Sequence, residues 1–268
     1  MIKEDPGISE IMQKKNNAAV VIYTFGNFEV YSDSKKIPQK SWKRDKSLQL
    51  LQFMIFSCHQ KALHKEQIID RLWEDDMDDQ GFKVALHGIS KVLEPSKKSH
   101  AESRFIERNG HTYRLNTSEL WVDSFSFESL IYMGNRYVHT NPTIAEQALR
   151  EALLLHTGTF LPDRIFEDWS ADERERLQLM FLNASVTLAE LLLEKNPAES
   201  IQLCQNALLE DLTWEDAYRI QMAAFYARGN RPMAIKTYQV CEKVLWEEMA
   251  LKPLPETRKL YEKIRSAE

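Results

Sequence analysis

Strand-like sequence is confined to the first 122 residues of this chain, and helical periodicity takes over after them. The first part alternates short β-branched and aromatic runs with three amphipathic segments, whereas almost no strand signal follows Asp123. With 268 residues, the chain is also longer than a domain with one ordinary hydrophobic core. We therefore expect a disordered leader at 1–18, an α+β domain at 19–117, a linker at 118–123 and an all-α domain at 124–268.

Two stretches of the first domain predict strands joined by turns. Val20–Val30 is apolar and β-branched around Gly26-Asn27, which indicates a strand, a turn and a second strand. Arg104–Leu115 carries Asn109-Gly110 between alternating apolar residues, a strong short-range signal for a tight hairpin. The first domain therefore begins with a small sheet and ends with a hairpin.

Three amphipathic helices are predicted between these strands. Apolar residues recur at helical spacing from Asp45, again from Leu63, and a third time from Phe82 to Leu93, where Pro95 ends the pattern. Strands, three helices and a hairpin, in this order, are typical of a winged helix-turn-helix domain.

The second domain contains an internal repeat. Asn196-Pro-Ala-Glu-Ser-Ile and Asn230-Arg-Pro-Met-Ala-Ile begin 34 residues apart, the tetratricopeptide period. We therefore expect tetratricopeptide-like helical repeats. The expected core residues are Trp169, Leu177, Leu182, Leu188, Ile201, Leu208, Tyr218, Met222, Tyr226, Ile235 and Tyr238.

Both domains resemble known families. The first domain resembles the OmpR/PhoB-type DNA-binding domain, in the version found in Streptomyces antibiotic regulatory proteins. The segments that carry this resemblance are, in order, IYTFGNFEV, SWKRDKSLQLLQFM, HKEQIIDRLW, FKVALHGISKVLEP and FIERNGHTYRL. The second domain resembles the bacterial transcriptional activator domain. The segments that carry this resemblance are GTFLPDRIFEDWSADERERL, AESIQLCQNALLEDLTWEDAYRIQMAAFYARGNRPMAIKTYQVC and LKPLPETRKLY. The two resemblances cover about Val20 to Ile264. They imply a bacterial transcriptional regulator that binds double-stranded DNA and works with RNA polymerase.

Charge divides unevenly between the two domains. The net charge of −5 is unfavourable for a DNA-binding protein as a whole. Residues 19–117 nevertheless hold 16 Lys and Arg against 13 Asp and Glu, while residues 118–268 hold 16 against 24. Only the first domain is therefore expected to approach DNA.

The third predicted helix is the candidate recognition helix. The face opposite its apolar stripe carries Gln80, Lys83, His87, Ser90 and Lys91. An ordinary solvated face is the alternative. The resembled family usually has Arg at one or both of the positions held here by Gly88 and Ser90, and fewer guanidinium groups mean fewer bidentate contacts to guanine. Modest intrinsic affinity, or reliance on dimers and on RNA polymerase, is expected.

Two further groups of residues are candidates for DNA contact. The hairpin tip carries Arg108, Asn109 and His111, of which Asn109 also suits a type I′ turn. The start of the first helix carries Lys43, Arg44 and Lys46, for which phosphate binding and plain solvation are equally supported.

The acidic stretch between the second and third helices permits two interpretations. In the resembled family this loop faces RNA polymerase, which makes Asp75, Asp76 and Asp78 candidate polymerase contacts, and a solvated turn is the alternative. A calcium loop is not expected, because Gln80 and His87 occupy positions that would need ligand carboxylates.

Motifs for catalysis, metals and membrane insertion are missing. There is no Gly-rich phosphate loop, no G-x-S-x-G and no H-E-x-x-H, so we expect neither an enzyme nor a cofactor. Cys58, His59 and His64 are spaced too irregularly for zinc. The three cysteines form no C-x-x-C, and no stretch has the length and apolarity of a membrane helix or a secretion signal. A cytoplasmic protein is expected.

These features together predict an activator that binds promoter repeats through the winged helix. The helical domain would form a homodimer on tandem sites, contact RNA polymerase, or receive a protein or small-molecule effector. The alternative is a protein-interaction adaptor whose winged helix no longer binds DNA strongly. We also expect a fragment from Val20 to Thr117 to fold alone.

Overall fold

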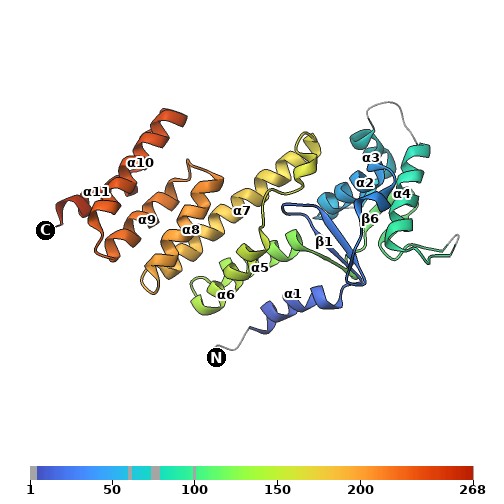
Figure 1. Cartoon of the computed structure of the whole chain (residues 1–268), viewed down its shortest axis with the longest axis horizontal. Coiled ribbons are helices and arrows are strands. Elements are labelled where there is room, and N and C mark those ends of the chain that lie inside the picture. Colours follow the sequence, from blue (N-terminus) through green and yellow to red (C-terminus); the bar gives the residue numbers. More distant parts are fainter. Residues whose placement is uncertain (1–4, 60–61, 74–78, 99–100, 268) are drawn as a thin grey trace. The chain divides into compact units, whose positions relative to one another are not determined.

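The structure is a computed structural model that describes residues 5–59, 62–73, 79–98 and 101–267 (Figure 1). The chain divides into two compact units. The N-terminal unit holds Pro6–Ser126 together with Leu155–Arg176, and the helical unit holds Phe127–Leu154 together with Leu177–Glu268. A stretch from the second half of the sequence therefore belongs to the N-terminal unit.

The first strands form as the sequence predicts. β1 (Val20–Tyr23) pairs antiparallel with β2 (Glu29–Ser32), and β2 pairs antiparallel with β3 (Lys35–Lys36). Alternate residues of β1 are buried, with Val20 and Ile22 facing the core.

A fourth strand replaces the expected linker. β7 (Leu120–Val122) pairs in parallel with β1, so that the sheet order is β3-β2-β1-β7. All three β7 side chains are buried. The Asp123 carboxylate directly after β7 accepts hydrogen bonds from the Thr24 amide at 2.8 and 2.9 Å and from the Phe25 amide at 3.1 Å. Burial raises the pKa of Asp123 to about 6, although these donors favour the ionised form.

The three predicted helices are present. They are α2 (Asp45–Phe56), α3 (Lys65–Leu72) and α4 (Asp79–Leu93), with short 3₁₀ turns at η1 (Gln39–Trp42) and η2 (Ser57–His59). α4 packs on α2, which explains the apolar stripe of each helix. The predicted hairpin is also present, formed by β5 (Ile106–Asn109) and β6 (Thr112–Leu115), and β4 (Leu63–His64) adds a third strand beside β6.

The stretch expected to be a disordered leader is largely a helix. α1 (Pro6–Asn17) contacts β7. The Lys15 ammonium lies 5.3 Å from the ring centre of Tyr23 and 5.2 Å from that of Trp121, and Ile8 is buried. These contacts stabilise a segment whose polar composition alone predicts no structure.

Residues 155–176 complete the N-terminal unit. Phe160 forms an isolated antiparallel bridge with Phe25, and the Leu161 amide donates to the Thr24 carbonyl at 2.9 Å. The Trp169 ring packs edge-on against Phe53 of α2, with ring centres 5.4 Å apart. Sequence periodicity assigns this segment to the helical domain, but its apolar side chains pack on the sheet and on α2.

Arg164 fastens the same segment to α2 by polar contacts. Its guanidinium donates to both carboxylate oxygens of Asp45, at 2.9 and 2.5 Å, and to the Gln52 side chain at 2.7 Å. Arg164 is almost fully buried, so these acceptors compensate its desolvation. The N-terminal turn of α2 is thereby tied to a residue 119 positions later in the sequence.

Helices make up the rest of the described chain. They are α5 (Asp123–Tyr137), α6 (Pro142–Leu155), α7 (Asp168–Leu192), α8 (Pro197–Glu210), α9 (Glu215–Ala227), α10 (Arg231–Met249) and α11 (Pro255–Ser266), with the 3₁₀ turn η3 (Pro162–Arg164) before α7. The first few residues of α5 and the first two turns of α7 belong to the N-terminal unit.

The predicted repeat corresponds to two equivalent helix starts. Asn196 and Asn230, 34 residues apart, are the N-cap residues of α8 and α10, and each side chain accepts a hydrogen bond from the amide three residues later. α8 packs on α9, and α10 packs on α9 and α11. Of the predicted core residues, Ile235 is only partly buried. The prediction is wrong for Tyr226, whose side chain is exposed at the end of α9. The others are buried.

Candidate nucleic-acid interface

The exposed face of α4 carries the residues that the sequence selects. Gln80, Lys83, His87 and Lys91 are exposed, and Ser90 is half-buried. Phe82, Ala85, Ile89 and Leu93 form the buried side of the same helix. Residues three and four apart share a helix face, so one polar stripe runs along α4.

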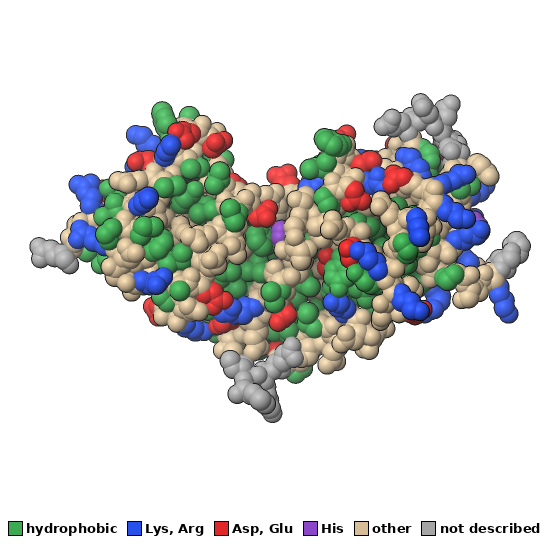
Figure 2. All heavy atoms as spheres, viewed as in Figure 1, with side chains coloured by type: hydrophobic (Ala, Val, Ile, Leu, Met, Phe, Trp, Pro, Cys, Tyr) green, Lys and Arg blue, Asp and Glu red, His purple; other side chains and the backbone are tan. Residues whose placement is uncertain are grey.

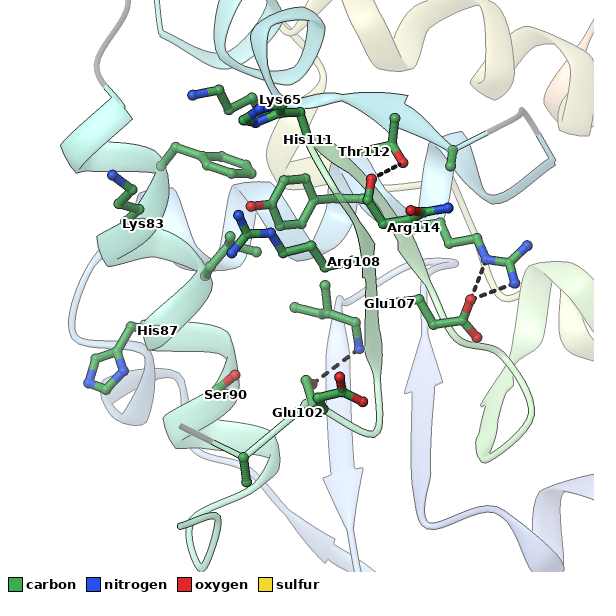
Figure 3. A pocket seen from close by; sticks show the side chains of 18 of the residues that line it. Lys65, Lys83, His87, Ser90, Glu102, Glu107, Arg108, His111, Thr112 and Arg114 are labelled. Atoms are coloured by element: carbon green, nitrogen blue, oxygen red, sulfur yellow. Dashed lines mark hydrogen bonds and ion pairs between the residues drawn. The ribbon is translucent and has the colours of Figure 1, made fainter. Parts of the chain in front are cut away.

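A hollow of about 1030 Å³ lies between α4 and the β5–β6 hairpin. The predicted residues that line it are Lys83, His87, Ser90, Arg108, Asn109 and His111. Gln80 and Lys91 do not line it. Figure 3 shows Arg108 reaching from β5 toward α4, while Arg114 of β6 is paired with Glu107. Lys and Arg side chains gather over α4 and the neighbouring hairpin in Figure 2.

The hairpin tip differs in detail from the prediction. Asn109 pairs with Thr112, so Gly110 and His111 are the two central turn residues. Only Gly110 has a positive φ, of 60°, which corresponds to a type II′ turn and not to the expected type I′. Asn109 is therefore the last residue of β5, and its side chain is available to the hollow.

Arg108 is held by its own hairpin. Its Nε donates to the Gly110 carbonyl at 2.9 Å, and its guanidinium carbon lies 5.7 Å from the ring centre of Tyr113. The side chain is exposed despite these contacts. A guanidinium held in this way keeps donors free for a phosphate.

Lys65 and Asp79 are not among the residues that the sequence predicts for this site. Both line the hollow, and the Lys65 ammonium lies 2.9 Å from one oxygen of Asp79 while the Lys83 ammonium lies 2.5 Å from the other. These two lysines lower the pKa of Asp79 to about 2. The spacing of Asp79 and Lys83 by four residues in a helix is a signal that predicts their pairing.

The basic residues before and in the first turn of α2 have different environments. Lys43, Arg44 and Lys46 are all exposed. The Lys46 ammonium donates to the Leu72 carbonyl at the end of α3 and lies 5.4 Å from the ring centre of Trp73. Lys46 therefore has a structural role in addition to any contact with phosphate.

The position of Gly88 corrects the comparison with the resembled family. A Cβ atom at Gly88 would lie 2.1 Å from the Ser47 hydroxyl oxygen and 2.9 Å from its Cβ. Gly88 thus faces α2 and not the hollow, and an arginine there would not fit without movement of α2. Ser90 does line the hollow, where its hydroxyl accepts a hydrogen bond from Lys97 at 3.5 Å. Only Ser90 can count as a missing arginine of the surface.

The candidate polymerase contacts Asp75, Asp76 and Asp78 lie outside the described residues. Within the described ranges, no three His, Cys, Asp or Glu side chains gather into a metal site. Burial raises the pKa of the Cys58 thiol to about 11, so this cysteine stays protonated at neutral pH.

The comparisons assign the family. The profile of the bacterial transcriptional activator domain matches residues 122–265, more than half of the sequence. The chain therefore belongs to the bacterial transcriptional activator domain family, a family of transcriptional regulators. A comparison with curated protein sequences gave no match.

A solved structure shares the fold. The chain is similar to Mycobacterium tuberculosis EmbR, solved in complex with a low affinity phosphopeptide, with a TM-score of 0.78 and 16% sequence identity. The similarity covers 92% of this chain and 65% of that chain, so this chain spans less than two thirds of the length of its neighbour. The predicted winged helix followed by helical repeats is confirmed. In the part of the chain that the structure describes, no helix combines the length and apolarity that a membrane crossing requires.

Proposed function

We propose that this chain is a cytoplasmic, sequence-specific DNA-binding regulator that activates transcription from promoter repeats by recruiting RNA polymerase. The observation that carries the proposal is the hollow between α4 and the hairpin. Cationic side chains line it from several elements, among them Lys65 from α3, Lys83 from α4 and Arg108 from β5. Cations converging from several elements on one concave surface suit a duplex backbone that winds past them.

In this proposal α4 is the recognition helix. Its N-terminal residues would meet base edges in the major groove, as in other helix-turn-helix proteins. Lys83 and His87 would reach bases or phosphates, while Arg108 at the hairpin would contact a phosphate or the adjacent minor groove. Lys91, outside the hollow, would contact the backbone.

The helical unit would supply the protein contacts. Large apolar side chains are exposed on it, among them Leu209 on α8, Trp246 and Met249 on α10, and Leu251 and Leu254 before α11. Exposed apolar side chains on helical repeats support binding of a protein, which we take to be a second copy on tandem sites, RNA polymerase or an effector.

A gel-shift comparison tests the DNA-binding part. The double variant Lys83→Glu and Lys91→Glu should lose binding to a promoter fragment, with little change in melting temperature because both side chains are exposed. The matched control is Lys252→Glu with Lys259→Glu, which makes the same charge change at exposed positions of the helical unit. Equal affinity of the two double variants would contradict the assignment of α4.

The polymerase part is tested separately. Changing Asp75, Asp76 and Asp78 to Asn should reduce transcription while promoter occupancy stays unchanged. Equal losses of occupancy and transcription would show that these residues act through DNA binding or folding.

The second candidate function is an adaptor that binds a protein in the same hollow. It is favoured by the carboxylates Asp79, Glu102 and Glu107, which line the hollow together with the cations. A mixed-charge surface of this kind suits a protein partner. DNA affinity that does not fall as salt rises would favour the adaptor.

A further inference from the structure

Three charged groups at the start of α4 form one ion cluster. Asp79 is the first residue of α4, and Lys83 follows one turn later; Lys65 is the first residue of α3. Each oxygen of the Asp79 carboxylate binds a different ammonium group, Lys65 at 2.9 Å and Lys83 at 2.5 Å. Figure 3 shows Lys65 and Lys83 on the two helices that border the hollow.

The Asp79 carboxylate stays ionised at the neutral pH at which DNA binding is measured. Its two lysine partners lower its pKa to about 2, and the N-terminus of a helix also favours a negative charge. The two lysines and the carboxylate together therefore carry one net positive charge, whereas the two lysines alone would carry two. One hydrogen-bond donor of each ammonium group is already used within the protein.

A DNA phosphate competes with Asp79 for these two lysines. About two-fifths of the Asp79 side chain and two-thirds of the Lys83 side chain are exposed, so the Lys83 pair can open into solvent. Exposed pairs of this kind contribute little, equivalent to about 1.5-fold to 5-fold in an equilibrium constant. The ion pair can therefore open, but Lys65 or Lys83 must break its pair with Asp79 before it contacts a phosphate.

We propose that Asp79 is a specificity-determining residue of the recognition surface. This inference rests on the proposed DNA-binding function. On DNA of arbitrary sequence, Asp79 withholds Lys65 and Lys83 from phosphates and repels the backbone. At the correct site, the carboxylate at the N-terminus of α4 accepts a hydrogen bond from a cytosine amino group, so its cost is offset there.

The test uses the full chain with Asp79→Asn and a random-sequence duplex at about 50 to 200 mM NaCl. The variant should bind this duplex about threefold to tenfold more tightly than the natural chain. The slope of log K against log salt should steepen by up to about 0.9 for each ammonium group released. Site selection from a random library should show that the variant has lost its preference for cytosine at one position.

Two controls separate the ion cluster from overall charge. Asp70→Asn removes an exposed carboxylate of α3 that does not line the hollow, and it should change affinity by less than about twofold. In a Lys83→Gln background, Asp79→Asn should have a smaller effect, because only Lys65 remains to be released. Asp79→Ser, which also removes the carboxylate, should reproduce the gain in affinity.

The outcomes of this test are distinguishable. A tighter Asp79→Asn variant that has lost the cytosine preference, with an unchanged Asp70→Asn variant, supports the proposal, whereas tighter binding with the base preference kept overturns the role of Asp79 in specificity. If both variants gain equally, or if Asp79→Asn changes neither affinity nor base preference while the natural chain binds DNA in a salt-dependent way, the role of Asp79 is overturned and the DNA-binding function stands. If the natural chain does not bind the duplex at low salt, both the proposed DNA-binding function and the role of Asp79 fail.

Discussion

Reducing the chain to Val20–Thr117 leaves the N-terminal unit without three of its parts. The fragment Val20–Thr117 contains all the elements that the sequence predicts for a winged helix. It lacks α1, β7 with Asp123, and the segment 155–176; β7 and that segment cover β1 and α2 in the full chain.

The cost of the cut follows from the side chains that lose their cover. Val20, Ile22, Phe25 and Phe53 are each at most 3% exposed in the full chain. Burying a side chain of this kind contributes about 1.5 to 3 kcal/mol, so uncovering half of each removes about 3 to 6 kcal/mol. A domain of this size is stable by only about 5 to 15 kcal/mol. We therefore expect the fragment to be marginal or unfolded, contrary to the prediction from sequence.

Thermal melting followed by far-ultraviolet circular dichroism measures this. The fragment Val20–Thr117 should show a broad, weakly cooperative transition, and the longer fragment Val20–Ser126, which restores β7 and Asp123, should regain part of the cooperativity. A sharp transition of the short fragment within a few degrees of that of the full chain would refute the reasoning.

Two further variants test particular contacts. Gly88→Ala should lower the free energy of unfolding by about 1 to 3 kcal/mol, because its Cβ would overlap Ser47, and adding Ser47→Gly should restore much of the loss in urea unfolding; destabilisation that Ser47→Gly does not relieve would argue against this contact. Burial lowers the pKa of His156 to about 4, so the folded state binds fewer protons than the unfolded state between pH 4 and 6.5, and the contribution of His156 to stability is lost as the pH falls through this range. The natural chain should therefore lose about 1 to 3 kcal/mol relative to His156→Gln between pH 7 and 4.5, whereas parallel stability curves for the two proteins would contradict the shift.

Local signals in the sequence predict most of the N-terminal fold. The helical spacing of Leu48, Leu51 and Met54 places α2, and Asn109-Gly110 places the hairpin, because periodicity and turn chemistry depend on neighbouring residues. The pairing of β7 with β1 escapes such signals. Leu120–Val122 is only three residues long, and its partner lies about 100 residues earlier.

The candidate site is predicted to the same extent and for the same reason. The polar stripe of α4 follows from helix periodicity, so Lys83 and His87 are found at once. The cluster of Lys65 with Asp79 depends on how α3 and α4 approach each other, which no local pattern encodes. The contact of Gly88 with Ser47 likewise depends on the packing of α4 on α2, so comparison with family positions alone misplaces Gly88 on the DNA side.

The salt dependence of DNA binding tests the central claim most directly. If Lys65, Lys83, Lys91 and Arg108 neutralise phosphates at the correct site, log K for a duplex that carries this site should fall linearly with log salt, with a slope of about −3 to −4. The double variant Lys83→Gln and Lys91→Gln should reduce the steepness of this slope by about 1.8. A flat dependence in the natural chain, or an unchanged slope in the double variant, would contradict DNA binding through α4.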